Sequence, residues 1–389
     1  MFSAGTAGAA SRPHPSLNML AFRGPTQHKV VQVSVQPFNM NSSGTHYLYA
    51  EDGTCPDSID VYKIGKSLTH VGNFPNDGCG NQGYFGTSSI AVTGTNSVHG
   101  PCLVYISQSG YVDSFPINAD GSLGSEVSHV PTAGNAAPDD VVISSNGKFA
   151  YVSDSSVDLE SYGIGAGCAL TFLKAAPTTE YYLSFVLDGT NLIAPDSNSG
   201  NIDTWTLGPN GSITFLASAP GQLSFPDSIA LQIQRTKSGK VTNVFTGQAT
   251  LGVPQAQGGQ YNKKTGAFAF LTGSPATDPN GADGAAVFFD SKDSVLIQAE
   301  QFTGTLASYS VSAGTPGVVG SISFTSETPL AVKTNAPADF AHLGSTLFVD
   351  ARYNGDIEAC HLSPGGASGC ASVAVMTNTT GTSVGLAVL

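Results

Sequence analysis

The sequence repeats one phrase seven times: an apolar strand that ends in a polar residue, a short loop, and a second strand that closes on an aromatic. The copies span residues 47–64, 103–117, 149–164, 192–207, 244–262, 295–311 and 347–362. Their starts lie roughly 40–60 residues apart, which is the spacing of propeller blades. Seven such units account for almost the whole chain. The repeat therefore predicts an all-β, seven-bladed β-propeller with four-stranded antiparallel blades.

A second pattern precedes most of the repeat phrases: a Pro or Gly, an acidic residue, and then an apolar run with small side chains. It occurs in APDDVVIS (137–144), FPDSIALQI (225–233), GADGAAVFF (281–289) and APADFAHL (336–343). SSIAVTG (88–94) and YLSFVLDG (182–189) fill the same place without the acid. Largely apolar runs suit a strand that is buried on both faces. We therefore expect these runs to be the innermost strands of their blades.

The two ends of the chain are expected to close the ring. Residues 1–27 are rich in Gly, Ala, Ser and Pro and read as a flexible lead-in, which leaves residues 28–389 for the propeller domain. VVQVSVQ (30–36) alternates as a strand does, and SVGLAVL (383–389) is the last strand. Sharing one blade between them would remove an open sheet edge, which is a pairing hazard.

Composition narrows the function classes. The chain has 28 Asp and Glu against 15 Lys and Arg, a net charge of −13, so most of its surface should repel DNA. No run of eighteen apolar residues is present, and no membrane span is expected. Phosphate-binding loops of the Walker or dinucleotide type are also absent from the sequence. We therefore expect a monomer that acts on a small molecule without a nucleotide cofactor.

The six cysteines bear on the compartment. Cys360 and Cys370 flank LSPGGASG, a turn sequence between two strands, and a disulfide across that hairpin is the favoured interpretation; two buried thiols are the alternative. The partners of Cys55, Cys79, Cys102 and Cys168 are not assigned. An even count and few lysines favour a secreted or periplasmic protein, although the N-terminus shows no clear apolar signal core and a cytoplasmic location is the alternative.

Three of the repeat phrases carry a family resemblance. SSNGKFAYVSDSSVDLESYGI (144–164), AEQFTGTLASYSV (299–311) and DARYNGDIEACHL (350–362) resemble the blade signature of the lactonase-type seven-bladed propellers. That family, with YVTN-type repeats, includes bacterial 6-phosphogluconolactonase and the fungal carboxymuconate-lactonizing enzymes. The resemblance covers roughly residues 29–389. It implies a lactone-hydrolysing or lactone-forming, cycloisomerase-like enzyme that acts on a small organic or sugar acid at the mouth of the central channel.

Two family positions carry over and one does not. A Glu that ends the second strand of a late blade corresponds to Glu300, and an Arg that follows this strand in another blade corresponds to Arg352. The family opens its inner strands with Pro-His, where this chain has Pro138-Asp139 and Pro226-Asp227. Histidine-based proton transfer is therefore not implied. This departure favours the alternative function, an extracytoplasmic propeller that binds a protein or glycan partner and catalyses nothing.

The first candidate site is a ring of acids around the axis. If each begins an inner strand, five side chains would share one face: Asp139, Asp140, Asp227, Asp283 and Asp339. Carboxylates held close together raise one another's pKa, which suits acid–base work. The same ring could hold Ca²⁺ or another divalent cation through Asp139 and Asp227, although no cofactor is required. The alternative is that each Asp caps its own turn.

The second candidate site is the set of residues that end the second strands, expected on one side of the disc: Asp52, Gln108, Asp154, Asp196, Gln248, Glu300 and Arg352. We assign carboxylate binding to Arg352, proton transfer to Glu300 and an assisting role to Asp139, because an Arg fork binds carboxylates and a carboxyl group can move a proton. The expected substrate-contacting acids are Asp154, Asp196, Asp227, Asp283 and Asp339. Alternatively, Glu300 and Arg352 are solvated loop charges or a pair that ties neighbouring blades together.

Overall fold

The fold is taken from a computed structural model of the chain. It describes residues 45–51, 56–75, 89–94, 97–107, 109–133, 137–154, 158–178, 181–224, 226–236, 239–248, 255–281, 284–300, 303–316, 318–332, 337–351, 355–376 and 385–389. The lead-in predicted for residues 1–27 and the strand predicted at 30–36 lie outside these ranges.

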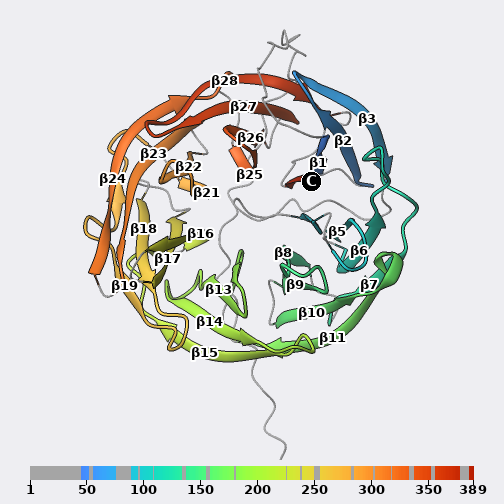
Figure 1. Cartoon of the computed structure of the whole chain (residues 1–389), viewed down its shortest axis with the longest axis horizontal. Helices are drawn as coiled ribbons and strands as arrows, with labels where there is room; N and C mark the ends of the chain where they lie inside the picture. The colour runs from blue at the N-terminus through green and yellow to red at the C-terminus, as the bar shows by residue number, and fades with distance from the viewer. Residues whose placement is uncertain are drawn as a thin grey trace, which may run out of the picture. The chain divides into compact units, whose positions relative to one another are not determined.

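The described strands form seven antiparallel sheets that stand around a common axis as the blades of a propeller (Figure 1). From the axis outward, the first three blades are β29 (Leu386–Val388), β1 (His46–Glu51), β2 (Ser58–Ile64), β3 (Leu68–Pro75); β4 (Ile90–Val92), β5 (Cys102–Ser107), β6 (Tyr111–Pro116), β7 (Ser128–Pro131); and β8 (Pro138–Ile143), β9 (Phe149–Asp154), β10 (Asp158–Ile164), β11 (Leu170–Pro177).

The other four blades are β12 (Val186–Asp188), β13 (Asn191–Pro195), β14 (Ile202–Leu207), β15 (Ile213–Ala219); β16 (Pro226–Thr236), β17 (Gly239–Gln248), β18 (Gln255–Tyr261), β19 (Phe268–Phe270); β21 (Gly284–Asp290), β22 (Val295–Glu300), β23 (Thr305–Thr315), β24 (Val318–Pro329); and β25 (Pro337–Leu343), β26 (Thr346–Ala351), β27 (Asp356–Ser363), β28 (Gly366–Val375). A short extra strand, β20 (Ala276–Thr277), pairs with β18. Among the described residues, no helix is long and apolar enough to cross a membrane.

The repeat phrase is the middle hairpin of each blade. Its seven copies become the second and third strands, from β1–β2 to β26–β27. All six runs predicted as innermost strands are innermost, from β4 to β25 (Figure 1). The prediction of a seven-bladed propeller is therefore confirmed strand by strand in the described part of the chain.

The ring closes where the chain ends meet. The last strand, β29, pairs antiparallel with β1, with Leu48 opposite Val388 and Ala50 opposite Leu386. The first blade thus takes its innermost strand from the C-terminus and its other three strands from the N-terminal part of the chain. This confirms that strands from the two ends of the chain share one blade, with β1 as the strand that pairs with β29, and no blade is left with an open neighbour.

The hydrophobic core is divided among the blade junctions. Each of the seven apolar clusters draws its residues from two neighbouring blades. In the cluster between the sixth and seventh blades, for example, Ile297 and Leu306 pack with Leu347 and Val349, and all four side chains are fully buried. Both faces of every sheet are therefore covered, which explains why the middle strands are apolar on both sides.

In the third, fifth and seventh blades, a buried polar side chain binds the connection that enters the blade. Glu160, Gln257 and Glu358 hold equivalent places near the start of the third strand, and none is exposed. Each accepts hydrogen bonds from backbone N–H groups of the segment arriving from the previous blade: from Ala133 at 2.6 Å, from Gln222 at 2.6 Å, and from Ala331 at 2.7 Å and Val332 at 3.0 Å. These side chains thus give hydrogen-bond acceptors to backbone N–H groups of the connections.

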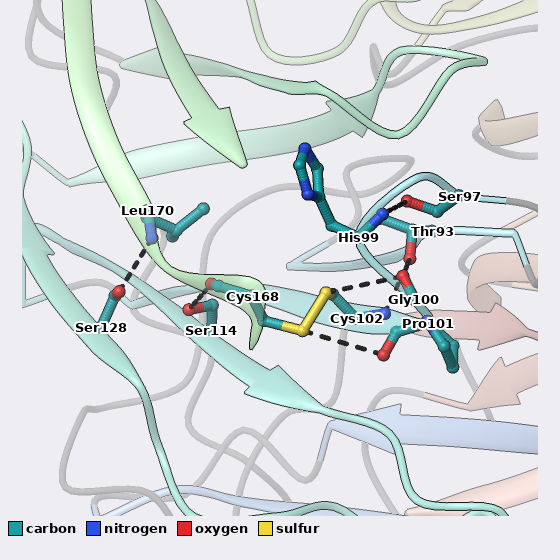
Figure 2. Close-up of a disulfide and its surroundings, with 10 residues drawn as sticks. All are labelled: Thr93, Ser97, His99, Gly100, Pro101, Cys102, Ser114, Ser128, Cys168 and Leu170. Carbon is teal, nitrogen blue, oxygen red and sulfur yellow. Dashed lines mark hydrogen bonds between the residues drawn. A yellow bond between two sulfur atoms is a disulfide. The ribbon is translucent and has the colours of Figure 1, made fainter. Parts of the chain in front are cut away.

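Two disulfides add covalent links. Cys360 and Cys370 are joined across the β27–β28 hairpin, as the sequence predicts. Cys102 of β5 is joined to Cys168 in a short 3₁₀ turn (Ala166–Cys168) of the next blade (Figure 2). The same turn is held by Ser114, whose hydroxyl donates to the Cys168 carbonyl at 2.7 Å. Cys55 and Cys79 lie outside the described residues.

The two disulfides should differ in what their removal costs. They close loops of 66 and 10 residues, so loop entropy assigns about 4 kcal/mol to Cys102–Cys168 and about 3 kcal/mol to Cys360–Cys370. We expect the Cys102→Ala/Cys168→Ala double variant to lose more stability in urea melts than Cys360→Ala/Cys370→Ala. An equal or reversed loss would show that loop closure does not govern their contribution.

Candidate functional site

The acids predicted from the sequence gather at one edge of the blades. Inner strands begin, and second strands end, at the same edge of each antiparallel sheet. We call this edge the acidic face. Among the described side chains it carries Glu51, Asp139, Asp140, Asp196, Glu300 and Asp339.

The inner-strand acids occupy two different positions. In β8, Pro138 pairs with Asp154 and Asp140 pairs with Ser153, so Asp139 is the extra residue of a bulge. The register of β16 shifts in the same way, which gives Asp227 the position of Asp139. A bulge re-aims the side chain that it carries. Asp139 is buried, with 4% of its surface exposed.

The other position bridges neighbouring blades. Asp140 accepts hydrogen bonds from the N–H of Val141 and from the N–H of Phe185 in the next blade, both at 2.9 Å. Asp339 does the same with Phe340 at 2.7 Å and, in the first blade, with Leu386 at 2.8 Å. Backbone donors favour the ionised carboxylate and fix its orientation. These contacts give both acids a structural use on the acidic face.

Asp196 caps the loop that follows β13. Its two carboxylate oxygens accept hydrogen bonds from the N–H of Asn198 at 2.8 Å and the N–H of Ser199 at 3.2 Å, and the Ser199 hydroxyl also donates to it. This is turn-capping geometry, an alternative that the sequence analysis offered for the inner-strand acids and not for Asp196. The side chain also lines a cavity described below.

Glu300 ends β22 with no exposed surface. It pairs with Gly284 of the inner strand and Thr305 of β23. Burial, with the negative charge of Glu300 as the next cause, raises the pKa of Tyr309 well above its usual range. The Tyr309 hydroxyl donates to Gln298 at 2.9 Å. Glu300 is thus a fully buried carboxyl group whose charge acts on the Tyr309 phenol.

Glu51 is an acid of the acidic face that the sequence analysis missed. It is the last residue of β1, it is fully buried, and it accepts a hydrogen bond from the Ser89 hydroxyl at 3.1 Å. Ala50 lies opposite Asp60 as Gln298 lies opposite Ala307, so Glu51 comes one residue before the position of Glu300. That position falls on Asp52, the residue chosen from the sequence, which lies outside the described residues.

Several predicted residues are not described. Arg352, Asp283, Asp52 and Gln108 lie outside the described residues, and for Asp154 and Asp227 the structure describes only their place in the strand.

The strand register locates Arg352 relative to Glu300. Ala351 pairs with Pro337 as Glu300 pairs with Gly284. Arg352 is therefore one residue further along than Glu300 in its own blade.

A possible cation set lies away from the axis. Ligand atoms of Asp113, Glu126 and His129 fall within 4.8 Å of one another on the outer part of the second blade. His129 Nδ1 is already hydrogen-bonded to Asp113 Oδ1 at 2.8 Å. These residues are distinct from Asp139 and Asp227, the pair that the sequence suggested for a divalent cation.

A cavity of about 360 Å³ opens at the outer part of the acidic face, between the third and fourth blades. It is lined by aromatic and polar side chains: Tyr182, Asp196, Ser199, Asn201, Asp203, Trp205, Phe215 and Ser218, with Pro177 and Thr178. Phe215 is 58% exposed and stands edge-on to the buried Trp205.

Two carboxyl groups on this side of the molecule have raised pKa values. Burial and then the charge of Asp196 raise the pKa of Asp203, against the opposing effect of hydrogen bonds from Ser218 and Tyr182. Burial, a hydrogen bond with Asp278 and the charge of Asp278 raise the pKa of Glu327 to about 7. Asp278 itself accepts the N–H groups of Asn280 and Gly281.

Comparison with solved structures finds the same architecture in lactonase-type propellers. A periplasmic gluconolactonase of Pseudomonas aeruginosa superposes with a TM-score of 0.67 at 17% identity, covering 89% of this chain and 99% of that one. A candidate 6-phosphogluconolactonase of Bacteroides fragilis gives 0.67 at 14% identity, covering 89% and 98%. A Lactobacillus plantarum protein gives 0.64 at 15% identity, covering 89% and 99%.

At these identities the likeness defines the fold. No protein-family model and no curated protein sequence matches the chain. The protein is a seven-bladed β-propeller with the architecture of the lactonase-type propellers.

The raised pKa of Glu327 predicts a pH dependence of stability. The unfolded carboxyl group titrates near 4.5 and the folded one near 7, so the folded state keeps a proton that the unfolded state has lost. The stabilising contribution is complete below pH 4.5 and is lost as pH rises through 7. We expect urea midpoints to fall between pH 5 and 8, and Glu327→Gln to flatten this fall.

Glu126→Gln, on the outer part of another blade, is the matched control and should keep the wild-type slope. If the urea midpoint of Glu327→Gln fell with pH as steeply as that of the wild type, Glu327 would not be the cause of the pH dependence.

Proposed function

We propose that the protein is a lactonase-type enzyme that opens or closes the lactone of a small organic or sugar acid on the acidic face. It would work as a secreted or periplasmic monomer. The observation that carries the proposal is the burial of Glu300 and Asp139 at one axial edge of a fold shared with a gluconolactonase. Two disulfides support an extracytoplasmic location.

The proposed chemistry uses three side chains. In hydrolysis, Glu300 takes a proton from the water that attacks the lactone carbonyl, and Arg352 stabilises the oxyanion. The ring C–O bond then breaks, and the proton passes from Glu300 to the departing ring oxygen. Asp139 assists by orienting the water. Lactone formation is the same path reversed, with Arg352 holding the free carboxylate.

Asp154, Asp196, Asp227, Asp283 and Asp339 remain the proposed contacts to substrate hydroxyls. Asp140 and Asp339 bridge neighbouring blades through backbone N–H groups. The orientation of these acids on the acidic face would therefore be set before the substrate binds. A fixed array of acceptors costs little reorganisation on binding.

A divalent cation held by Asp139 and Asp227 would polarise the lactone carbonyl when bound.

Isosteric substitution tests these roles. We expect Glu300→Gln to lower kcat by about 100-fold and Arg352→Ala by about 100-fold or more, on a panel that includes glucono-δ-lactone and 6-phosphogluconolactone. Thermal melting should stay near wild type in Glu300→Gln, because the amide keeps the shape of the acid. Each assay is run with EDTA and with added CaCl₂, which separates a cation requirement from acid–base catalysis.

Glu126→Gln serves as the control and should keep full turnover. The assignment fails if wild type opens a lactone and Glu300→Gln and Arg352→Ala open it equally fast. Absence of lactone turnover in the wild type would favour the second candidate function.

The second candidate is glycan binding without catalysis, supported by the cavity between the third and fourth blades. Exposed aromatic rings beside hydroxyl, amide and carboxylate groups suit sugars, which present C–H faces and hydroxyls together. Here Phe215 offers the exposed ring, and Asn201 and Asp196 offer the polar partners.

A glycan array is the measurement for this candidate. Wild type should bind at least one oligosaccharide, and Phe215→Ala should lose most of that binding, because the ring supplies the apolar contact. Val318→Ala, which removes an equally exposed apolar side chain from another blade, should bind as wild type does. No bound oligosaccharide, or equal binding by Phe215→Ala, counts against it.

A further inference from the structure

A second cavity, of about 560 Å³, lies at the edge of the blades opposite the acidic face. It is formed where β12 and β18 end and β17 and β19 begin, in the fourth and fifth blades. Lys240 stands near the start of β17, and the same strand reaches the acidic face at Gln248. The cavity is therefore separated from Glu300 by the length of a strand.

The charge of this cavity is opposite to that of the chain. The protein carries 28 acidic and 15 basic residues, but the cavity is lined by three lysines and one acid: Lys240, Lys263, Lys264 and Asp188. One carboxylate cannot neutralise three ammonium groups. The lining has a local excess of two positive charges.

Asp188 brings two of the lysines together. It is 1% exposed, and its carboxylate accepts hydrogen bonds from Lys240 Nζ and from the Thr242 hydroxyl. Lys263 Nζ donates to the backbone carbonyl of Asp188 at 2.6 Å and lies 3.8 Å from the same carboxylate oxygen that Lys240 contacts. Two ammonium groups thus flank one buried oxygen, and each has further N–H donors.

The surrounding residues hold this arrangement while leaving it open. The side chains of Lys240 and Lys263 are 41% and 39% exposed. Asn191 donates to the Lys263 carbonyl at 3.0 Å and to the Tyr261 hydroxyl at 2.7 Å, which fixes the backbone under the lysine. Gly189, with a φ of +62°, leaves room for the ammonium group, since a Cβ there would lie 2.8 Å from Lys263 Nζ.

Part of the remaining wall is apolar. Val241, Ala267, Phe268 and Pro316 line the cavity beside the lysines. A bare ion would leave this wall unused, whereas an organic body that carries its charges at one end would contact both parts. Phosphate esters and dicarboxylates both have this form.

We propose that this cavity binds a small organic dianion, with Lys240, Lys263 and Lys264 contacting its charged end and Phe268 its apolar body. The site is independent of the lactonase proposal, because its residues lie at the opposite edge of the blades. Asp188 pairs with Lys240 and Lys263, and Lys264 lines the same cavity, where we assign it to the charged end of the ligand. The Asp188 pairs keep the other two lysines in place when the ligand is absent.

Calorimetric titration with two probes tests the proposal and separates the ligand sources. Phenyl phosphate represents phosphate esters, and phthalate represents dicarboxylates; inorganic phosphate and benzyl alcohol test the charged and apolar parts alone. We expect at least one organic dianion to bind more tightly than inorganic phosphate. Lys264→Ala should weaken that binding about tenfold, since a charge-assisted hydrogen bond is lost.

Lys66→Ala, which removes an exposed lysine of the first blade, is the matched control and should bind as wild type does. The proposal is overturned if neither organic probe binds, or if Lys66→Ala weakens binding as much as Lys264→Ala. Glu300→Gln should bind the probe with wild-type affinity. The binding result can therefore be interpreted even if the lactonase proposal fails.

Discussion

Apolar contact between neighbouring blades is the interaction on which the rest of this structure depends. No blade has a core of its own: each of the seven clusters is shared by two sheets, so every sheet needs a neighbour on both faces. A single open junction would expose two such faces to water. Ring closure by β29 against β1 is therefore a condition for stability and completes the packing of the first blade.

This constraint also explains the acids. Apolar side chains fill the space between the blades. The backbone N–H groups where strands begin and connections enter therefore need hydrogen-bond acceptors from other side chains. Asp140 and Asp339 supply them between inner strands, and Glu160 and Glu358 supply them to the incoming connections. Four of the 28 acidic residues thus take part in joining the blades. A buried acid in this fold is therefore not by itself a sign of function, because some buried acids serve to join the blades.

The two ends of the blades therefore present different chemistry. The acidic face carries the buried acids Glu300 and Asp139, to which we assign roles in the proposed lactone chemistry. The opposite edge concentrates lysines around Asp188 in a protein that has few. Because antiparallel strands run the full width of a blade, residues at the two ends of one strand, such as Lys240 and Gln248, belong to separate sites.

The sequence by itself determined the fold: the sevenfold repeat, the inner-strand runs, the closing strand and the Cys360–Cys370 hairpin disulfide all follow from local patterns. Local patterns could not give the blade-to-blade register. The packing of the first two blades brings Glu51 to the Ser89 hydroxyl, and a bulge gives Asp139 and Asp140 different surroundings. Only the tertiary structure joined Cys102 to Cys168 and brought Lys240 and Lys263 to Asp188, because these contacts cross blade junctions. Pairing across a junction depends on how whole sheets pack, and no short stretch of sequence records it.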